Sequence, residues 1–223
     1  MKKQVYSAVI CDFDGTIVDS MPDILFCMKA AYAKEGVYDA IPVPEHIGPP
    51  LRECLKLITP GLANAVLEKV GEKYRNKYDT SNYPNTLVYP EVKETLDFLE
   101  KEKIKLYLVT NKRSVATLRM LKIFKLEYFL SVISPDIKSS EQVSKTEMLA
   151  FLLKKEKIKP ENALYVGDSV MDIFSAHANM LKAVAVTYGY NTKKQLKKAG
   201  PDYIIDSFEE LIKITGVSGK GPK

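Results

Sequence analysis

The chain has 223 residues, of which 46% are hydrophobic, and its formal net charge is +5, from 33 Lys and Arg against 28 Asp and Glu. This length and apolar content suffice for a packed core with a smaller attached unit, so a wholly disordered chain is excluded. The lysines are interspersed with acidic residues, as in 154–159. This pattern favours a solvated surface over a nucleic-acid groove, which usually needs clustered arginines and stacking aromatics.

No apolar run approaches the roughly 20 residues that a membrane-spanning helix needs, and the first apolar segment is too short for a signal peptide. We therefore expect a soluble, cytoplasmic protein that does not bind a membrane. The three cysteines include no closely spaced pair, which indicates neither a disulfide framework nor a zinc ribbon. We interpret Cys11, Cys27 and Cys54 as small buried apolar side chains.

Short β-branched runs alternate with longer amphipathic segments along the chain. This alternation is typical of an α/β fold, in which a doubly wound parallel sheet has helices on both faces. Strands are expected at residues 5–11, 105–110, 131–134, 163–167, 183–187 and 203–205. The predicted core is therefore Rossmann-like.

The stretch after the first strand breaks this alternation, because about seventy residues there have only helical character, more than a strand-to-helix loop needs. An inserted all-helical domain fits this interval. Its first helix is expected to begin at Ser20, whose hydroxyl would cap free amides, and to end at Gly36 in a left-handed conformation. A second helix is expected after Pro50 and a third through residues 62–74.

The predicted division of the chain is a core of residues 1–17 and 88–216, a helical domain of residues 18–87 and a disordered tail of residues 217–223. The two crossings between core and helical domain are expected to act as hinges.

Acidic residues follow two of the predicted strands. Asp12 and Asp14 stand two positions apart after the first strand, so an extended backbone points them the same way. A turn signal accounts for Asp14 and Gly15 but leaves Asp12 without a structural reason. Asp168 ends a later strand, and Asp172 lies one helical turn beyond it on the same side, although Asp168 alone could be a helix cap.

Ligands of open α/β sheets bind outside the carboxyl ends of the strands, so both acidic groups are expected to face one crevice. Four carboxylates in one crevice repel each other unless a cation is present or some of them are protonated. Oxygen ligands without Cys or His suit Mg²⁺, and neither histidine lies in a metal-spaced pair. The sequence therefore predicts a magnesium site and disfavours zinc.

Four short motifs, in order, resemble those of the haloacid dehalogenase-like superfamily. Residues 12–16, Asp-Phe-Asp-Gly-Thr, resemble the first motif, and residues 108–111 resemble the second. Lys145 resembles the third motif, and Gly167-Asp168 with Asp172 resembles the fourth. The resemblance covers nearly the whole chain, and the helical insertion resembles the cap domain of the phosphoglycolate phosphatase-like branch.

This resemblance implies a phosphoric monoester hydrolase in which Asp12 attacks phosphorus and forms an aspartyl-phosphate. Asp14 would protonate the departing oxygen, and its backbone carbonyl would be a metal ligand together with Asp12, Asp168 and Asp172. Lys145 would offset the negative charge of the nucleophile and of the phosphoryl group. Dehalogenases of the superfamily lack the second aspartate, so Asp14 favours phosphoryl transfer.

Four further residues would contact the phosphate. Thr110 would donate its hydroxyl to a phosphoryl oxygen, helped by the Asn111 amide at the start of the next helix, although Thr110 could instead only cap that helix. Gly15 would let the backbone turn closely around the phosphate, and the Phe13 amide would donate to it.

The third motif departs from the pattern of the family, whose members often have Lys-Pro there. In this chain Lys145 is followed by Thr146, and Lys138 is a nearby competitor. We favour Lys145 because it directly precedes an amphipathic helix.

Residues 46–52, which end in Gly-Pro-Pro-Leu-Arg, resemble a cap segment of the same branch. We predict that Arg52 contacts a second anionic or polar group of the substrate, with a solvated surface arginine as the alternative. The expected partner is a small phosphorylated metabolite, such as phosphoglycolate, a sugar phosphate or pyrophosphate. A phosphomutase like β-phosphoglucomutase and a non-catalytic binder of phosphate ligands are the alternatives, and the chain could be a monomer or a homodimer.

Overall fold

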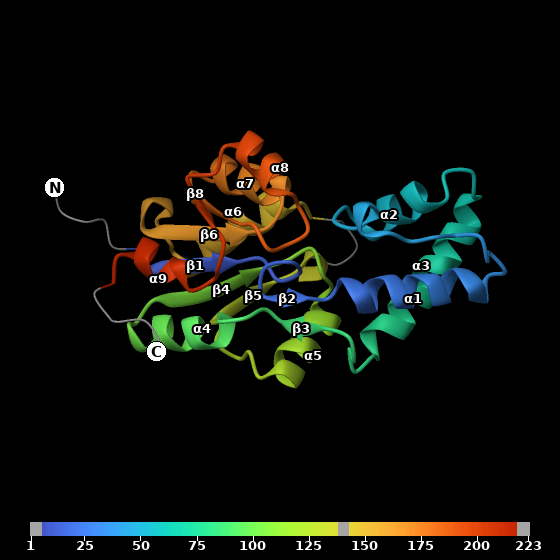
Figure 1. Ribbon diagram of the computed structural model, residues 1–223, viewed down its shortest axis with the longest axis horizontal. Coiled ribbons are helices and arrows are strands. Elements are labelled where there is room, and N and C mark those ends of the chain that lie inside the picture. The colour runs from blue at the N-terminus through green and yellow to red at the C-terminus, as the bar shows by residue number, and fades with distance from the viewer. Residues whose placement is uncertain (1–5, 138–142, 218–223) are drawn as a thin grey trace.

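The computed structural model describes residues 6–137 and 143–217, and it contains a six-stranded sheet with helices on both faces (Figure 1). All neighbouring strands of this sheet are parallel, in the order β5-β4-β1-β6-β7-β8. The strands are β1 (Ala8–Cys11), β4 (Lys105–Val109), β5 (Ser131–Ile133), β6 (Ala163–Gly167), β7 (Lys182–Val186) and β8 (Tyr203–Ile205). The predicted α/β class with a doubly wound sheet is confirmed. The predicted tail, apart from Val217, lies outside the described residues.

β1 lies in the middle of the sheet, and all four of its residues are buried. Alternate side chains point to opposite faces of a strand, so β1 supplies Val9 and Cys11 to one hydrophobic core and Ala8 and Ile10 to the other. Burial on both faces explains why the strand is a continuous apolar run and not an alternating pattern.

Six helices cover the two faces of the sheet. The first core contains side chains of α4 (Val92–Lys101), α5 (Ser114–Phe124) and α9 (Glu210–Thr215). The second core contains side chains of α6 (Lys145–Glu156), α7 (Val170–Ala178) and α8 (Lys193–Ala199). Short 3₁₀ turns at Pro135–Ile137 and Pro160–Asn162 complete this part of the chain.

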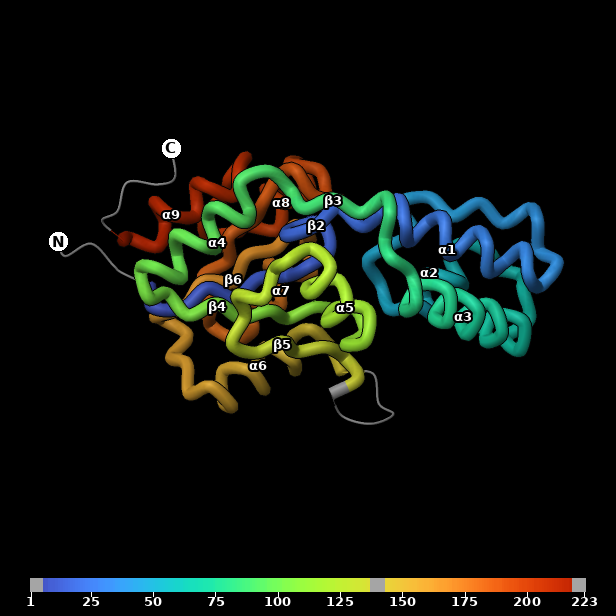
Figure 2. The backbone as a smooth tube through the Cα atoms, turned by 90° about the horizontal axis from the view of Figure 1, so that it is seen from below, coloured from blue at the N-terminus to red at the C-terminus, as the bar shows by residue number. Residues whose placement is uncertain are grey.

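The helical insertion lies beside the sheet, beyond the carboxyl end of β1 (Figures 1 and 2). It consists of α1 (Met21–Lys34), a 3₁₀ turn (Pro44–His46), α2 (Leu51–Ile58) and α3 (Asn64–Asp79). The chain enters through β2 (Val18–Asp19) and leaves through β3 (Leu87–Val88), and these two strands pair in antiparallel fashion. The two crossings therefore lie side by side, while the division at residues 18 and 88 stays a prediction.

The start of α1 differs from the expectation. Ser20 is the residue before the helix, but its side chain makes no capping hydrogen bond, and its hydroxyl donates instead to Asp14 Oδ1. The prediction that Ser20 caps α1 is therefore wrong, because the carboxylate competes with the helix amides for the hydroxyl. The end of α1 agrees with the expectation, since Gly36 has a left-handed φ of 75°.

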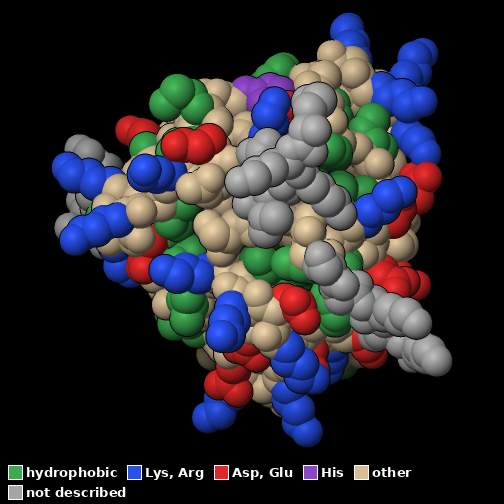
Figure 3. Space-filling model, turned by 90° about the vertical axis from the view of Figure 1, so that its left-hand side faces the viewer, with side chains coloured by type: hydrophobic (Ala, Val, Ile, Leu, Met, Phe, Trp, Pro, Cys, Tyr) green, Lys and Arg blue, Asp and Glu red, His purple; other side chains and the backbone are tan. Residues whose placement is uncertain are grey.

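Three expectations from the composition concern the surface charges, membrane-spanning helices and the cysteines. Figure 3 shows the end of the molecule away from the insertion, where basic and acidic side chains are interspersed. No helix among the described residues is long and apolar enough to cross a membrane. Cys11 in β1, Cys27 in α1 and Cys54 in α2 are buried free thiols, as expected.

Asp23, in the first turn of α1, joins the two crossings of the helical insertion. Its buried carboxylate accepts hydrogen bonds from the Asn85 amide at 3.0 Å, the Asn85 side-chain nitrogen at 3.0 Å and the Thr86 hydroxyl at 2.8 Å. Each of these donors precedes β3, so one side chain fixes the outgoing segment against the incoming helix.

The substitution Asp23→Ala leaves those buried donors without their acceptor. We expect it to lower the free energy of unfolding by about 2–3 kcal/mol, because unsatisfied buried polar groups carry their full desolvation cost. Urea denaturation measures this loss. The exposed Asp39 of the same insertion supplies the matched control, and a loss as small as that of Asp39→Ala would contradict the expectation.

Candidate active site

The carboxyl ends of β1 and β6 lie side by side and carry the two acidic groups. The strands pair with Cys11 opposite Val166, and the Asp12 amide donates to the Val166 carbonyl at 2.8 Å. Asp12 directly follows β1, and Asp168 directly follows β6. Oxygens of Asp12, Asp168 and Asp172 all lie within 4.8 Å of one another, and the three side chains are buried. The structure therefore brings these three predicted carboxylates together.

Lys145 supplies the positive charge of this cluster. Its Nζ lies 2.8 Å from Asp12 Oδ2 and 2.6 Å from Asp172 Oδ1. Lys145 is the first residue of α6, and the helix start is fixed by a capping box between Ser144 and Glu147. The competing Lys138 lies outside the described residues.

Asp172 is held by several hydrogen bonds from its own surroundings. Its Oδ2 accepts from the Ser169 amide at 3.0 Å and the Ser169 hydroxyl at 2.6 Å, and its Oδ1 accepts from the Tyr165 hydroxyl at 3.0 Å. Ser169 is the N-cap of α7. The alternative that Asp168 caps this helix is therefore wrong, and Asp168 is free for another role.

Asp168 lies in a narrow space between two glycines. A Cβ at Gly15 would lie 2.3 Å from Asp168 Oδ2, and a Cβ at Gly189 would lie 2.2 Å from Asp168 Cβ. Gly15 also has a left-handed φ of 78°. The Tyr190 amide donates to Asp168 Oδ2 at 2.7 Å, and the Thr16 hydroxyl donates to Oδ1 at 3.3 Å. Only glycine at both positions leaves room for this carboxylate.

Burial and mutual repulsion shift the pKa values of the cluster. Burial raises the pKa of Asp12 well above its usual range, and Lys145 opposes this shift. Burial, followed by repulsion from Asp172, raises the pKa of Asp168 to about 7. Burial alone lowers the pKa of Lys145, but attraction to Asp12 and Asp172 outweighs it and raises that pKa. Among the residues that the structure describes, three buried carboxylates meet one ammonium, that of Lys145, so the cluster has an excess of negative charge that a cation would relieve.

The donor set fits a hard divalent ion. All three converging groups are carboxylates, and no His or Cys joins them within residues 6–137 and 143–217. Such oxygen ligands suit Mg²⁺ or a similar cation, whereas zinc sites usually contain nitrogen or sulfur.

Asp14 lies apart from the three-carboxylate cluster. Its Oδ1 accepts from the Ser20 hydroxyl and lies 3.0 Å from Lys112 Nζ. The Gly15 amide donates to the Val18 carbonyl at 2.8 Å, which closes the turn after β1. A partly buried acid beside a lysine and a serine can exchange protons with a bound ligand.

The second motif is only partly as expected. Thr110 directly follows β4 and is buried, and its hydroxyl accepts from the Lys112 amide at 3.1 Å. α5 begins at Ser114, with Arg113 as N-cap. The expectation that the Asn111 amide stands at the start of this helix is therefore wrong, and so is the alternative that Thr110 caps it. The exposed Asn111 belongs to the loop.

Phe13 and Arg52 occupy different environments. The Phe13 ring is fully buried in the first core, so its side chain packs away from the crevice as expected. Arg52 is an exposed residue in the first turn of α2. It lines a recess of about 190 Å³ with Arg75 and Gly71 of α3. The structure thus places Arg52 in the helical insertion and not among the carboxylates.

Three contact residues were missed by the sequence analysis. Lys112 pairs with Asp14, Gly189 leaves room for Asp168, and Tyr190 binds Asp168 through its amide. The Tyr190 hydroxyl also accepts from the Ser20 amide at 3.1 Å. Lys112 directly follows the second motif at residues 108–111, and this position is a signal that could have identified it, whereas no motif pointed to residues 189 and 190.

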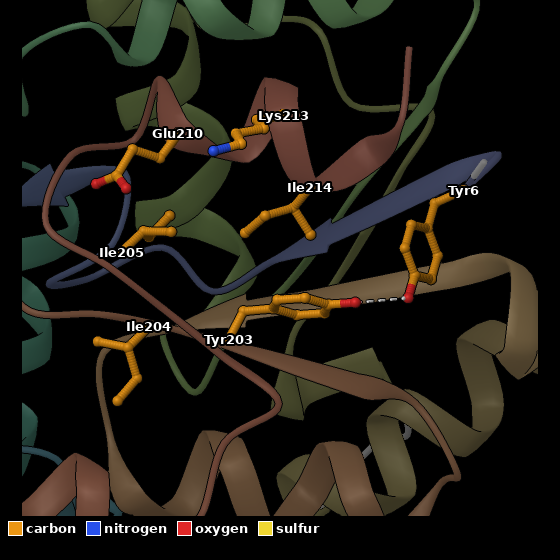
Figure 4. Close-up of a pocket in the computed structure, with 7 residues that line it drawn as sticks. All are labelled: Tyr6, Tyr203, Ile204, Ile205, Glu210, Lys213 and Ile214. Carbon is orange, nitrogen blue, oxygen red and sulfur yellow. Dashed lines mark hydrogen bonds between the residues drawn. The ribbon is translucent and has the colours of Figure 1, made fainter. Parts of the chain in front are cut away.

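A larger cavity lies elsewhere in the molecule. It has a volume of about 430 Å³ and is lined by seven residues that include Tyr6, Tyr203 and Lys213 (Figure 4). The hydroxyls of Tyr6 and Tyr203 lie 3.4 Å apart. Tyr6 precedes β1, and the other lining residues belong to β8 and α9, so this cavity shares no residue with the acidic cluster.

Comparison with known proteins gives consistent results. The haloacid dehalogenase-like hydrolase family matches residues 9–186. A phosphoglycolate phosphatase of Vibrio parahaemolyticus is 30% identical over 98% of this chain and 100% of its own. Phosphoglycolate phosphatase 1 of Pseudomonas aeruginosa is 32% identical over 92% of this chain and 78% of its own.

Solved structures agree with the sequence relatives. A predicted phosphatase from Clostridium acetobutylicum superposes with a TM-score of 0.82 at 27% identity, covering 94% of this chain and 98% of its own. A predicted phosphoglycolate phosphatase from Haemophilus somnus gives a TM-score of 0.82 at 25% identity over the same shares of the two chains.

The raised pKa of Asp168 predicts how stability depends on pH when no divalent cation is bound. A free aspartate has a pKa of roughly 4, so between roughly pH 4 and 7 the folded protein keeps a proton that the unfolded chain has lost. Stability contributed by that proton falls as the pH rises through this window. We expect the Tm in chelator to decrease from about pH 5 to about pH 7.

Asp168→Asn supplies the control for this pH dependence, because the amide is neutral at every pH and keeps the shape of the side chain. Calorimetric melts of Asp168→Asn should show a weaker decrease of Tm over the same window. A decrease equal to that of the unsubstituted protein would contradict the assignment of the shift to Asp168.

Proposed function

This chain belongs to the haloacid dehalogenase-like hydrolase family, and on that premise we propose that it is a Mg²⁺-dependent phosphatase acting on a small phosphorylated metabolite. The observation that carries the proposal is the convergence of Asp12 and Asp168 at neighbouring strand ends, with Lys145 within 2.8 Å of Asp12. The relatives named phosphoglycolate phosphatase support a small anionic substrate, and phosphoglycolate is the substrate we propose first.

Asp12 is the proposed nucleophile. Phosphate monoesters hydrolyse so slowly that catalysis must combine several effects, and a covalent intermediate splits the reaction into two easier steps. Lys145 contacts Asp12 Oδ2, so Oδ1 is the attacking oxygen in this proposal. Oδ1 bonds to phosphorus while the ester P–O bond breaks, which leaves an aspartyl-phosphate and the free alcohol.

Asp14 is the proposed acid and base. It donates a proton to the departing alkoxide oxygen in the first step. In the second step it takes a proton from the water that attacks the aspartyl-phosphate, and inorganic phosphate leaves as Asp12 is regenerated. Its contacts with Ser20 and Lys112, away from the buried cluster, support a separate role in proton transfer.

The residues proposed to hold Mg²⁺ are Asp12, Asp168 and the backbone carbonyl of Asp14, with Asp172 orienting its neighbours. When bound, the ion supplies positive charge that offsets the carboxylates and the phosphoryl oxygens. Lys145 adds a second positive charge beside the nucleophile. Thr110, together with the Phe13 and Asn111 amides and the backbone turn at Gly15, is proposed to hold the phosphoryl group.

The substitution Asp12→Asn removes the nucleophile but keeps the size of the side chain. We expect phosphate release from phosphoglycolate with Mg²⁺ to fall by at least about 10³-fold. Acid-quenched wild-type protein should yield a phosphorylated peptide that contains Asp12. Asp97→Asn, at an exposed ion pair with Lys101, should leave the rate unchanged.

Two outcomes of this experiment would contradict the proposal. Undiminished release by Asp12→Asn would rule out the covalent route. In a parallel assay with a sugar phosphate as substrate, an isomerised product with little free phosphate would instead identify a phosphomutase.

Arg52 is the proposed contact for a second anionic group of the substrate. Loss of one charge-assisted hydrogen bond corresponds to about a tenfold change in affinity, so Arg52→Ala should raise KM for phosphoglycolate about tenfold. KM for p-nitrophenyl phosphate, which has no second anionic group, should stay unchanged. Lys56→Ala on the same helix is the control, and equal changes for both substrates would contradict the role.

A further inference from the structure

We propose that Lys112 of the core and Tyr78 of the helical insertion together hold the Asp14 carboxylate in the orientation from which it transfers protons. Lys112 is thus a positioning residue that acts through Asp14. This inference rests on the proposed function, because it takes Asp14 as the acid and base of that reaction. The inference adds that the orientation of Asp14 depends on the position of the helical insertion relative to the core.

Lys112 contacts both partners at once. Its Nζ lies 3.0 Å from Asp14 Oδ1 and donates to the Tyr78 hydroxyl at 2.6 Å. The same nitrogen lies 4.4 Å from the centroid of the Tyr78 ring, within the range of a cation–π contact. One ammonium therefore bridges the core loop after β4 and the last turn of α3.

The burial of Lys112 makes these contacts necessary. Only 5% of its side chain is exposed, and 21% of that of Asp14. An ammonium removed from water is costly unless a charge and further hydrogen-bond acceptors surround it. Burial raises the pKa of Tyr78 well above its usual range, so its hydroxyl stays neutral and available as an acceptor. If Tyr78 moved away, the lysine would lose one acceptor and gain access to water.

The loop that carries Lys112 is itself fixed. The Lys112 amide donates to the Thr110 hydroxyl at 3.1 Å. The next residue, Arg113, forms an ion pair with Asp79, which follows Tyr78 on α3. Two successive residues of the core thus contact two successive residues of the insertion, so the pairing of Lys112 with Tyr78 is a specific docking and not an isolated contact.

Tyr78 is rigid enough to act as a support. Its ring stacks on Tyr74 at a centroid distance of 5.3 Å and meets Tyr83 edge to face at 5.2 Å. Only 2% of Tyr78 is exposed. The second contact of Asp14, the Ser20 hydroxyl, comes from the entry into the same insertion. Both supports of the carboxylate therefore depend on how the insertion is seated.

The test compares two leaving groups in the first chemical step. Glycolate is a poor leaving group that needs a proton from Asp14, whereas p-nitrophenolate leaves without one. Single-turnover formation of the aspartyl-phosphate, followed by acid quench, isolates that step from the later hydrolysis. For Lys112→Met we expect about a 100-fold slower first step with phosphoglycolate, as for a misplaced catalytic group.

With p-nitrophenyl phosphate the first step of Lys112→Met should change by less than about threefold, since no proton transfer is needed. Lys112→Arg keeps the charge and should recover part of the loss. Tyr78→Phe, which removes the acceptor but keeps the ring, should slow the phosphoglycolate step about threefold to tenfold and spare p-nitrophenyl phosphate. Lys122→Met, at an exposed position of α5, is the control.

Three results would overturn the inference. An equal loss with both substrates would indicate a general structural role for Lys112. A higher KM with an unchanged first step would indicate that Lys112 binds substrate. If Lys112→Met fails to fold by thermal melting, Tyr78→Phe decides alone, and no difference between its substrates rejects the inference. The proposed function fails separately, through retained activity of Asp12→Asn.

Discussion

The pairing of Lys145 with Asp12 and Asp172 is the interaction on which the site depends. In the part of the chain that the structure describes, the Lys145 ammonium contacts two of the three buried carboxylates, so the cluster depends on the relative positions of α6, β1 and α7. The parallel pairing of β1 with β6 sets the distance between the strand ends, and the capping boxes at Ser144 and Ser169 fix the helices that carry Lys145 and Asp172. The fold therefore supports an excess of negative charge that a divalent cation can offset.

The helical insertion contributes to the site through contacts and not only by covering it. Ser20 at its entrance and Tyr78 near its exit both reach the surroundings of Asp14, directly or through Lys112. Tyr190 adds a third link, because its amide binds Asp168 while its hydroxyl binds the entrance of α1. The acid that we propose is therefore positioned by segments of the helical insertion, so any movement of the insertion would also change the surroundings of Asp14.

The sequence was sufficient for the sheet and the acidic cluster, because both depend on local signals. A central parallel strand is buried on both faces and is a plain apolar run, and residues just beyond such strands must meet at one edge. Contacts between side chains that are distant in the sequence have no such local signal. Lys112 and Tyr78 are 34 residues apart, and a lysine in a loop is usually solvated. The role of Ser20 was missed because its hydroxyl had two acceptable partners, a helix amide and a carboxylate, and only packing decides between them.

The buried thiols have a consequence for handling and observing this protein. Burial raises the pKa of Cys27 and Cys54 to about 11 and raises that of Cys11 further, so almost none of the three is a reactive thiolate at neutral pH. Alkylating reagents and mild oxidants should therefore spare the native enzyme, unlike phosphatases that use a cysteine nucleophile. Cys11 lies in the central strand, whereas Cys27 and Cys54 lie in the helical insertion. The rate at which each thiol is modified therefore reports local opening of the core or of the insertion separately.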